Sequence, residues 1–245
     1  RDEDGKPLLD KILDVAGQKG TGKWSAIAAM DENDPLTLIT EAVYARLLSA
    51  LYPERIKAAS LYSGKLKVES GKLSDNAQLS IEDVRQALYA AKLISYAQGF
   101  SLLRHASEHC GWDLDYGTIA RIWRKGCIIR SVFLQKITEA YRKDPDLENL
   151  LFDDFFHTKI QEALPAWRRV VAEGALSGVA LPAMSSALNY FDGLRTLYSA
   201  ANMIQAQRDY FGAHTYERTD RERGHFFHTN WTGEGGNTVS GTYSV

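Results

Sequence analysis

The sequence predicts an all-α protein, and three features of the chain support this prediction. Apolar residues recur at helical spacing in several long segments, whereas the strict alternation of a half-buried strand is nearly absent. The chain has 245 residues with 44% hydrophobic and 11% aromatic content, which is sufficient for one large domain or two small ones. Glycine, proline and clusters of small polar residues separate the periodic segments, so they mark the ends of the predicted helices.

The predicted helices include long helices that form the core. Shorter helices are expected at about 7–16, 35–51, 116–125 and 128–142, with stops at Gly17, Pro53, Gly126 and Asp144-Pro145. One long apolar face is formed by Tyr89, Leu93, Tyr96, Phe100 and Leu103, which step by four, three, four and three residues. Two further stripes contain Ile160, Leu164, Trp167 and Val171 and, after Pro182, Ala187, Phe191, Leu194, Tyr198 and Ala201.

Two segments lack helical spacing. Residues 60–80 are rich in Gly and Ser and are expected to form a surface loop. After Gly212 come a charged run, the rings of Phe226, Phe227 and Trp231, and a Gly/Ser/Thr-rich end. Such a segment should fray or bury its rings against another surface, and we expect a partner chain to supply that surface. The predicted organisation is a helical domain over residues 1–212 and an irregular C-terminal tail over residues 213–245.

Charge and cysteine content exclude several classes of function. With 29 Lys and Arg against 31 Asp and Glu, the net charge of -2 creates no overall field that attracts nucleic acid or an anionic membrane. No apolar run approaches the roughly 20 residues that span a bilayer, and the first residues show no signal-peptide pattern. Cys110 and Cys127 form no CxxC pair, which favours a reducing compartment. We therefore expect a cytoplasmic protein.

The segment from Gly17 to Trp24 (GQKGTGKW) is the strongest local candidate for a binding site. It is similar to a nucleotide phosphate loop, but Trp24 replaces the magnesium-binding hydroxyl and the preceding segment 7–16 is predicted to be helical, so NTP hydrolysis is not expected. The glycines still let backbone N–H groups approach an anion, while Lys19 supplies charge and Thr21 a hydroxyl donor. The segment could instead be a helix C-cap followed by a solvated turn.

A second motif, His105-Ala106-Ser107-Glu108-His109, matches the HxxEH pattern of inverted zinc peptidases. A catalytic zinc site also needs a third protein ligand and a shielded cleft. The motif lies just before Cys110-Gly111-Trp112, where we expect a helix to end. We therefore expect no metal site here and interpret both histidines as part of a polar helix face. His157, His225 and His228 are likewise interpreted as surface or interface residues.

The stretch from Ile12 to Trp24 (ILDVAGQKGTGKW) resembles the signature of the 6-phosphogluconate dehydrogenase family at every constrained position. The resemblance continues through residues 41–46 (EAVYAR), 94–100 (ISYAQGF), 123–131 (WRKGCIIRS) and 205–216 (QAQRDYFGAHTY). It implies the helical C-terminal domain and tail of that enzyme. The family's N-terminal dinucleotide-binding domain, with its GxGxxG fingerprint, is not found in this sequence. The catalytic lysine and glutamate of the family would lie upstream of Arg1, so we expect this chain alone to be inactive.

The resemblance also implies a reaction and a set of site residues. The family uses NADP to oxidise the 3-hydroxyl of 6-phosphogluconate, and the product loses carbon dioxide through an enediol to give ribulose 5-phosphate, a step of the pentose phosphate pathway. Lys19, Thr21 and Arg46 are expected to bind the substrate phosphate, and Arg208 and His214 to reach it from the second subunit of a homodimer. In addition, the resemblance implies that the tail residues Ser240, Gly241, Thr242 and Tyr243 contact NADP.

Simpler interpretations remain open at this point. Arg46 could be an ordinary helix-surface cation, and Arg208 could pair with Asp209 or another acid. Two other classes of function also fit: a non-catalytic helical dimerisation module, and a related β-hydroxyacid dehydrogenase with a different acid substrate. The first predicts a gene without an upstream dinucleotide-binding segment. The second predicts activity on a non-phosphorylated acid.

Overall fold

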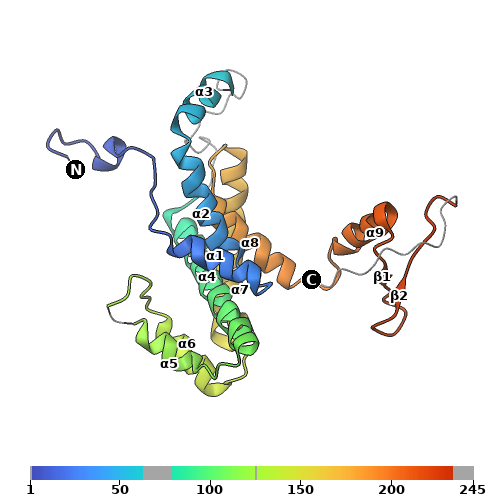
Figure 1. The fold of residues 1–245 in the computed structure, drawn as a ribbon. Coiled ribbons are helices and arrows are strands. Elements are labelled where there is room, and N and C mark those ends of the chain that lie inside the picture. Colours follow the sequence, from blue (N-terminus) through green and yellow to red (C-terminus); the bar gives the residue numbers. More distant parts are fainter. Residues whose placement is uncertain (1, 63–78, 125, 234–245) are drawn as a thin grey trace. The chain divides into compact units, whose positions relative to one another are not determined.

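The computed structural model describes residues 2–62, 79–124 and 126–233 (Figure 1). Within these ranges the chain is built from helices, and each strand is only two residues long, so the predicted all-α fold is confirmed. The chain forms two compact units, Arg1–Asp192 and Gly193–Val245. The boundary that the sequence predicts, between residues 212 and 213, falls inside the second unit. No described helix has both the length and the apolar content needed to cross a membrane.

The helices of the first unit are joined by turns and loops. They are α1 (Thr21–Asp31), α2 (Thr37–Ala50), α3 (Tyr52–Tyr62), α4 (Ile81–Cys110), α5 (Tyr116–Ile122), α6 (Leu134–Lys143), α7 (Asp154–Leu176) and α8 (Pro182–Leu194), with 3-10 turns η1 (Leu8–Lys11) and η2 (Leu150–Phe152). The second unit contains α9 (Ala201–Gly212) and an antiparallel hairpin of β1 (Tyr216–Glu217) and β2 (Phe226–Phe227). In this hairpin Tyr216 lies opposite Phe227.

The core of the first unit lies between α4 and α7, which run side by side in Figure 1. The predicted apolar face of α4 is buried here, since Leu93 and Phe100 are each 1% exposed. Trp167 of α7 is fully buried. The ring of Phe100 also lies 5.4 Å from the rings of Trp123 and Tyr141, which attaches α5 and α6 to α4. The stripes predicted on α4 and α7 thus form the core. Of the third predicted stripe only the start, Ala187 and Phe191, packs there, whereas Leu194 and Tyr198 are exposed.

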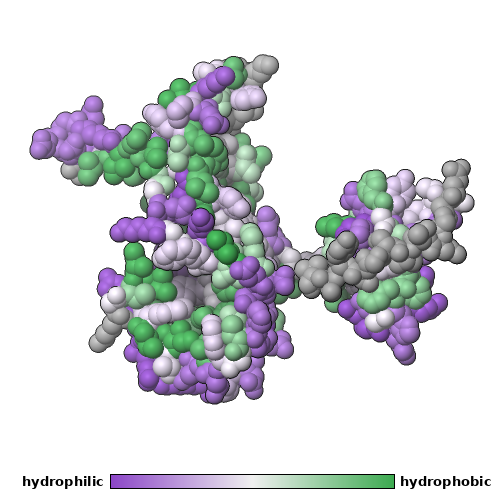
Figure 2. Space-filling model, viewed as in Figure 1, coloured by the Kyte–Doolittle hydropathy of each residue, from purple (hydrophilic) through white to green (hydrophobic). Residues whose placement is uncertain are grey.

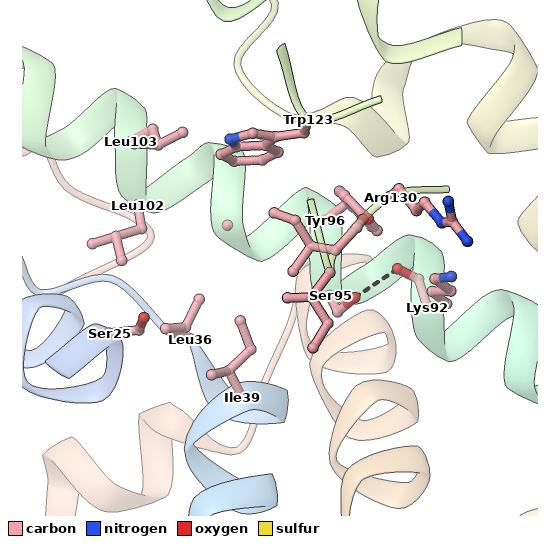
Figure 3. A pocket seen from close by; sticks show the side chains of 13 residues that line it. Ser25, Leu36, Ile39, Lys92, Ser95, Tyr96, Leu102, Leu103, Trp123 and Arg130 are labelled. Atoms are coloured by element: carbon pink, nitrogen blue, oxygen red, sulfur yellow. Dashed lines mark hydrogen bonds between the residues drawn. The ribbon is translucent and has the colours of Figure 1, made fainter. Parts of the chain in front are cut away.

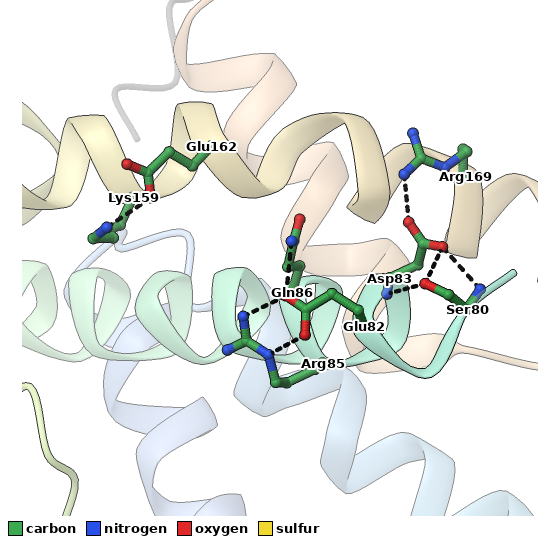
Figure 4. Close-up of polar contacts among 8 residues, drawn as sticks. All are labelled: Ser80, Glu82, Asp83, Arg85, Gln86, Lys159, Glu162 and Arg169. Atoms are coloured by element: carbon green, nitrogen blue, oxygen red, sulfur yellow. Dashed lines mark hydrogen bonds and ion pairs between the residues drawn. The ribbon is translucent and has the colours of Figure 1, made fainter.

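Polar contacts fix the start of α4 against α7 (Figure 4). Ser80 and Asp83 form a capping box, in which the Asp83 N–H donates to Ser80 Oγ at 3.0 Å and the Ser80 N–H donates to Asp83 Oδ2 at 2.9 Å. Arg169 of α7 pairs with the other carboxylate oxygen of Asp83. The Ser80 hydroxyl and amide, followed by Arg169, lower the pKa of Asp83 to about 2. At its other end α4 stops at Cys110, as predicted, because Gly111 adopts a φ of 65°.

Several predicted helix bounds are wrong for local reasons. Residues 7–16 form only the short turn η1, because no side chain there is buried to stabilise a helix. The helix expected over 128–142 begins only at Leu134, and the preceding segment is held in a turn, where the Tyr96 hydroxyl donates to the Ile129 carbonyl. The helix expected over 116–125 ends at Ile122. The stripe expected to run from Ala187 to Ala201 is interrupted between α8 and α9.

The sequence does not predict the helices α1, α3 and α9. α1 begins inside the segment interpreted as a loop, because Gly20 acts as its N-cap with a φ of 99°, a conformation that glycine adopts without strain. α3 begins one residue before the predicted stop at Pro53. Proline is tolerated in a first helical turn, where its missing N–H has no helical partner. Residues 63–78 of the predicted loop lie outside the described residues.

Candidate functional site

Lys19 and Thr21 lie at the start of α1, where backbone donors are available. The N-cap is Gly20, so no side chain caps this end. The Trp24 N–H donates to the Gly20 carbonyl at 2.9 Å, and the N–H groups of the first turn before it have no helical acceptor. Together with the helix dipole, such donors favour an anion. Exposed Lys19 adds a positive charge next to them.

Close packing of α1 on α2 brings the start of α1 to the part of α2 that carries Arg46. A Cβ atom on Gly22 would lie 2.9 Å from Cγ2 of Val43, so only glycine fits at this crossing. Arg46 follows Val43 by three residues and therefore shares its face of α2. The side chains of Lys19 and Arg46 are exposed and pair with no acid among the residues that the structure describes. Both cations are thus available to an anionic ligand.

The segment before α1 is attached to α2 and α3. The Ala16 N–H donates to Ser49 Oγ at 2.9 Å, and the Ser49 hydroxyl donates to the Arg46 carbonyl at 2.7 Å. Arg55 pairs with the Asp14 carboxylate and also donates to the carbonyls of Asp14 and Ser49, each at 3.1 Å. The hydrogen bond from Arg55 lowers the pKa of Asp14. Ser49 and Arg55 are supporting residues that the sequence analysis missed, because they are distant from Asp14 and Ala16 in sequence.

In the second unit, Arg208 and His214 line one pocket of about 320 Å³. Gln205 connects them: Arg208 Nη1 donates to Gln205 Oε1 at 3.0 Å, and the Gln205 amide donates to the carbonyl of His214 at 3.1 Å. A Cβ atom on Gly212 would come within 2.8 Å of the His214 ring, which explains a glycine here. The sequence analysis did not assign Gln205, although its position three residues before Arg208 places both on one helix face.

Asp209 does not pair with Arg208, which was the simpler alternative, but attaches the hairpin to α9. Its carboxylate is fully buried and accepts hydrogen bonds from His228 Nδ1 at 3.0 Å, the Thr229 N–H at 3.0 Å and Trp231 Nε1 at 2.8 Å. The side chain of His228, expected to be an ordinary surface or interface residue, is only 19% exposed. The described part of the tail therefore docks on α9 of its own chain.

We expect this docking to weaken as the pH falls below the ordinary Asp value of 3.8. Burial raises the pKa of Asp209, but the donors of Thr229, His228 and Trp231 together lower it by more. A group whose pKa is lowered by folding stabilises the fold above its unfolded pKa, and this contribution is lost as the pH falls through the folded pKa. Hydrogen exchange measured by mass spectrometry should show a protected Thr229 amide at neutral pH and declining protection in acid.

The Asp209→Ala variant should lack this protection at all pH values. Asp220→Ala, in the exposed turn of the same hairpin, is the matched control and should retain it. Equal protection in Asp209→Ala and the wild type would contradict the role assigned to this carboxylate.

A further pocket of about 460 Å³ lies between α1, α2, α4 and the segment after α5 (Figure 3). Most of its lining is apolar, with Leu36 just before α2, Ile39 from α2 and Leu102 from α4, and Lys92 and Arg130 lie at one side. The lining residues include no carboxylate and no histidine.

The HxxEH histidines bind carboxylates of the turn between α1 and α2. His105 Nδ1 lies 2.9 Å from Asp34 Oδ2, and His109 Nδ1 lies 2.9 Å from Glu32 Oε2. Among the described residues, no group of three or more His, Cys, Asp or Glu side chains is arranged to hold a metal ion. The tail residues Ser240, Gly241, Thr242 and Tyr243, expected to contact NADP, lie outside the described residues.

Fold and site together define an all-α domain with exposed cations suited to a small anionic ligand. The chain belongs to the 6-phosphogluconate dehydrogenase family, because a sequence model described as the C-terminal domain of 6-phosphogluconate dehydrogenase matches residues 1–231. This match confirms the resemblance found in the sequence.

Relatives support the same assignment. The protein named 6-phosphogluconate dehydrogenase, decarboxylating, from Treponema pallidum is 53% identical over 247 residues, which cover 100% of this chain and 51% of the relative. The Rattus norvegicus protein of the same name is 53% identical over 245 residues, which cover 100% of this chain and 50% of the relative. The chain thus spans about half the length of these curated relatives.

A solved structure is also similar. It is the 6-phosphogluconate dehydrogenase of Plasmodium falciparum, described in its apo form, with its cofactor NADP+ and with its substrate 6-phosphogluconate. The two chains are 41% identical with a TM-score of 0.83, over 91% of this chain and 47% of the other.

Proposed function

We propose that the whole protein, of which this chain forms the helical C-terminal part, catalyses the NADP-dependent oxidative decarboxylation of 6-phosphogluconate to ribulose 5-phosphate. In this proposal the chain binds the substrate phosphate and takes part in dimerisation. The observation that carries the proposal is the close approach of Gly22, in the uncapped first turn of α1, to Val43 of α2, one turn before Arg46. Because the chain belongs to the 6-phosphogluconate dehydrogenase family, the ligand of these cations is proposed to be a sugar phosphate.

The side chains of Lys19, Thr21 and Arg46, together with the first N–H groups of α1, have the chemistry that suits a phosphate dianion. Arg46 offers a planar fork that can donate to two phosphate oxygens, Lys19 contributes a mobile charge, and Thr21 and the first amides of α1 donate from fixed positions. Such contacts bind and orient the sugar acid for reaction elsewhere in the site. NADP, when bound, accepts the hydride removed from C3, and the resulting β-keto acid then loses carbon dioxide. We assign no proton transfer to this chain.

The described residues do not themselves fit a dinucleotide site. A dinucleotide fold needs parallel strands with a glycine-rich turn before a helix, whereas the described strands are the short antiparallel pair β1 and β2. The proposal therefore places NADP on a domain outside this chain. The predicted contacts from Ser240, Gly241, Thr242 and Tyr243 are part of this proposal.

We further infer that the whole protein is a homodimer in which Arg208 and His214 complete the phosphate site of the partner subunit. Exposed apolar side chains gather before α1 and on α2 and α3, as Figure 2 shows in green. They include Leu9, Leu13, Leu47, Leu48 and Ile56. An apolar surface of this kind is typical of contact with another chain or domain. The free thiols of Cys110 and Cys127 support the cytoplasm as the compartment.

The experiment that tests this function uses the full-length protein. We expect it to reduce NADP when 6-phosphogluconate is added and to release one carbon dioxide for each NADPH, followed by absorbance and by trapped carbon dioxide. Gluconate, which lacks the phosphate, should be a much poorer substrate. Failure to reduce NADP would contradict the proposed function. Equal activity on gluconate would instead favour a relative that acts on a non-phosphorylated acid.

A further inference from the structure

A stripe of polar side chains on α4 binds the turn between α1 and α2. Gln98, Ser101, His105 and His109 are spaced by three, four and four residues, so they lie on one helix face. We call these four residues the polar stripe. Gln98 is fully buried, and its Oε1 accepts a hydrogen bond from the N–H of Leu38, in the first turn of α2, at 3.1 Å. The stripe thus attaches the hairpin of α1 and α2 to the core helix.

Asp34 is the buried acceptor at the centre of this contact. Its side chain is 1% exposed, and Oδ2 accepts from Ser101 Oγ at 2.6 Å and from His105 Nδ1 at 2.9 Å. The other oxygen, Oδ1, is buried and has no hydrogen-bond partner among the described residues. A buried carboxylate with so few donors depends strongly on each of them, because removing one leaves charge without compensation. His105 is therefore central to the attachment.

The orientation of the His105 ring is fixed at both nitrogens. Nε2 lies 3.0 Å from Nη2 of Arg104, and a guanidinium can only donate, so Nε2 accepts and Nδ1 carries the proton donated to Asp34. Arg104 is itself held by Glu108, with Nη1 and Oε1 separated by 2.7 Å. The ring therefore links Asp34 of the turn to Arg104 of α4. His109 makes a similar but 71% exposed contact with Glu32, which is expected to contribute less.

The turn joins the helices α1 and α2, which lead to the proposed phosphate-binding residues. Thr21 begins α1, about 15 Å from the turn, and Lys19 lies just before it, while Arg46 lies about 14 Å along α2, given a rise of about 1.5 Å per helical residue. The close packing of Gly22 on Val43 makes α1 and α2 move together. A tilt of about 5° of these helices about the turn would therefore displace the cations by roughly 1 Å.

We propose that His105 is a positioning residue for the phosphate site, which it orients through Asp34 without touching the substrate. The inference rests on the proposed function, because the orientation of α1 and α2 affects catalysis only if their cations bind the substrate phosphate. The His105 ring, through its contact with Asp34, holds the hairpin so that the first turn of α1 and Arg46 converge on one phosphate.

The test compares two variants of the full-length protein. His105→Phe retains a planar ring but removes both hydrogen bonds, whereas His105→Asn retains an amide donor near the position of Nδ1. We expect His105→Phe to raise KM for 6-phosphogluconate roughly 10-fold and kcat to change less than about 2-fold, the pattern of lost uniform binding. The inhibition constant of inorganic phosphate should rise in parallel, and His105→Asn should restore most of both. His157→Phe, on the exposed face of α7, is the matched control.

The outcomes separate this inference from the proposed function. A folded His105→Phe variant with unchanged KM and unchanged phosphate inhibition overturns the positioning role, as does a loss confined to kcat. If His105→Phe does not fold, Asp34→Asn, which weakens the same link with little change of shape, replaces it and must show the same rise in KM. If the wild type does not reduce NADP with 6-phosphogluconate at all, the proposed function fails instead.

Discussion

Replacing Arg46 with Ala in the full-length enzyme is expected to raise KM for 6-phosphogluconate roughly 10- to 100-fold, because a charge-assisted contact contributes about 1.5–3 kcal/mol. Lys19→Ala should act in the same direction and less strongly, since a lysine offers a single mobile charge where an arginine offers a fork. Steady-state kinetics over a range of substrate concentrations measures both effects. The value of kcat should change less than KM, because the phosphate is distant from the bonds that react.

Two exposed cations outside the α1–α2 hairpin provide matched controls. Lys57 lies on α3 and Arg142 on the last turn of α6, and both side chains are exposed. Their Ala variants should bind substrate as the wild type does. Unchanged substrate affinity in both Lys19→Ala and Arg46→Ala would refute the phosphate assignment.

The same variants test whether the site is shared between subunits. If Arg208 reaches the partner's phosphate, dimers that combine a Lys19→Ala subunit with an Arg208→Ala subunit contain one intact site and one with both defects. Mixing the two variants under conditions that exchange subunits should then restore activity at low substrate concentration. A mixture no more active than its components would place both residues in the site of a single chain.

Apolar periodicity predicts the core of this fold well and the ends of its helices poorly. Leu93 and Trp167 are buried because their apolar stripes must face another helix, and spacing alone reveals that face. Local packing and cap geometry decide the rest. Residues 7–16 have suitable spacing but bury nothing, so they do not form a long helix. Gly20, by contrast, is a helix N-cap because the chain turns there in a left-handed conformation.

The candidate site, too, could be predicted only in part from the sequence. The resemblance points to Lys19, Arg46 and Arg208. In the structure Lys19 precedes the N-cap of α1, Arg46 lies one turn after Val43 on α2, and Arg208 lies beside His214 in a pocket of its own unit. Their supports, such as Gln98 and Asp34, could not be predicted from the sequence. They bind partners about 60 to 70 residues away, and only the packed fold brings such residues together. The histidines of the HxxEH motif take part in the same network of supports.

Trp167→Ala should be the most destabilising single substitution in the first unit that we can name. The indole is fully buried, its Nε1 donates to the Met184 carbonyl of α8 at 3.2 Å, and its ring lies 6.3 Å from that of Phe191. Truncation leaves a large cavity between α7 and α8 and removes the hydrogen bond from the indole to the Met184 carbonyl. We expect a loss of about 3–5 kcal/mol in the free energy of unfolding.

Urea unfolding followed by circular dichroism measures this loss as a shift of the midpoint to lower urea. Trp167→Phe should lose less, because it retains an aromatic ring and gives up mainly the N–H donor and part of the volume. Trp112, which is 54% exposed after the end of α4, provides the matched control. Its Ala variant should lose no more than about 1 kcal/mol, since the side chain leaves little cavity. Equal midpoint shifts for Trp167→Ala and Trp112→Ala would show that the contact between α7 and α8 does not stabilise the fold as its burial indicates.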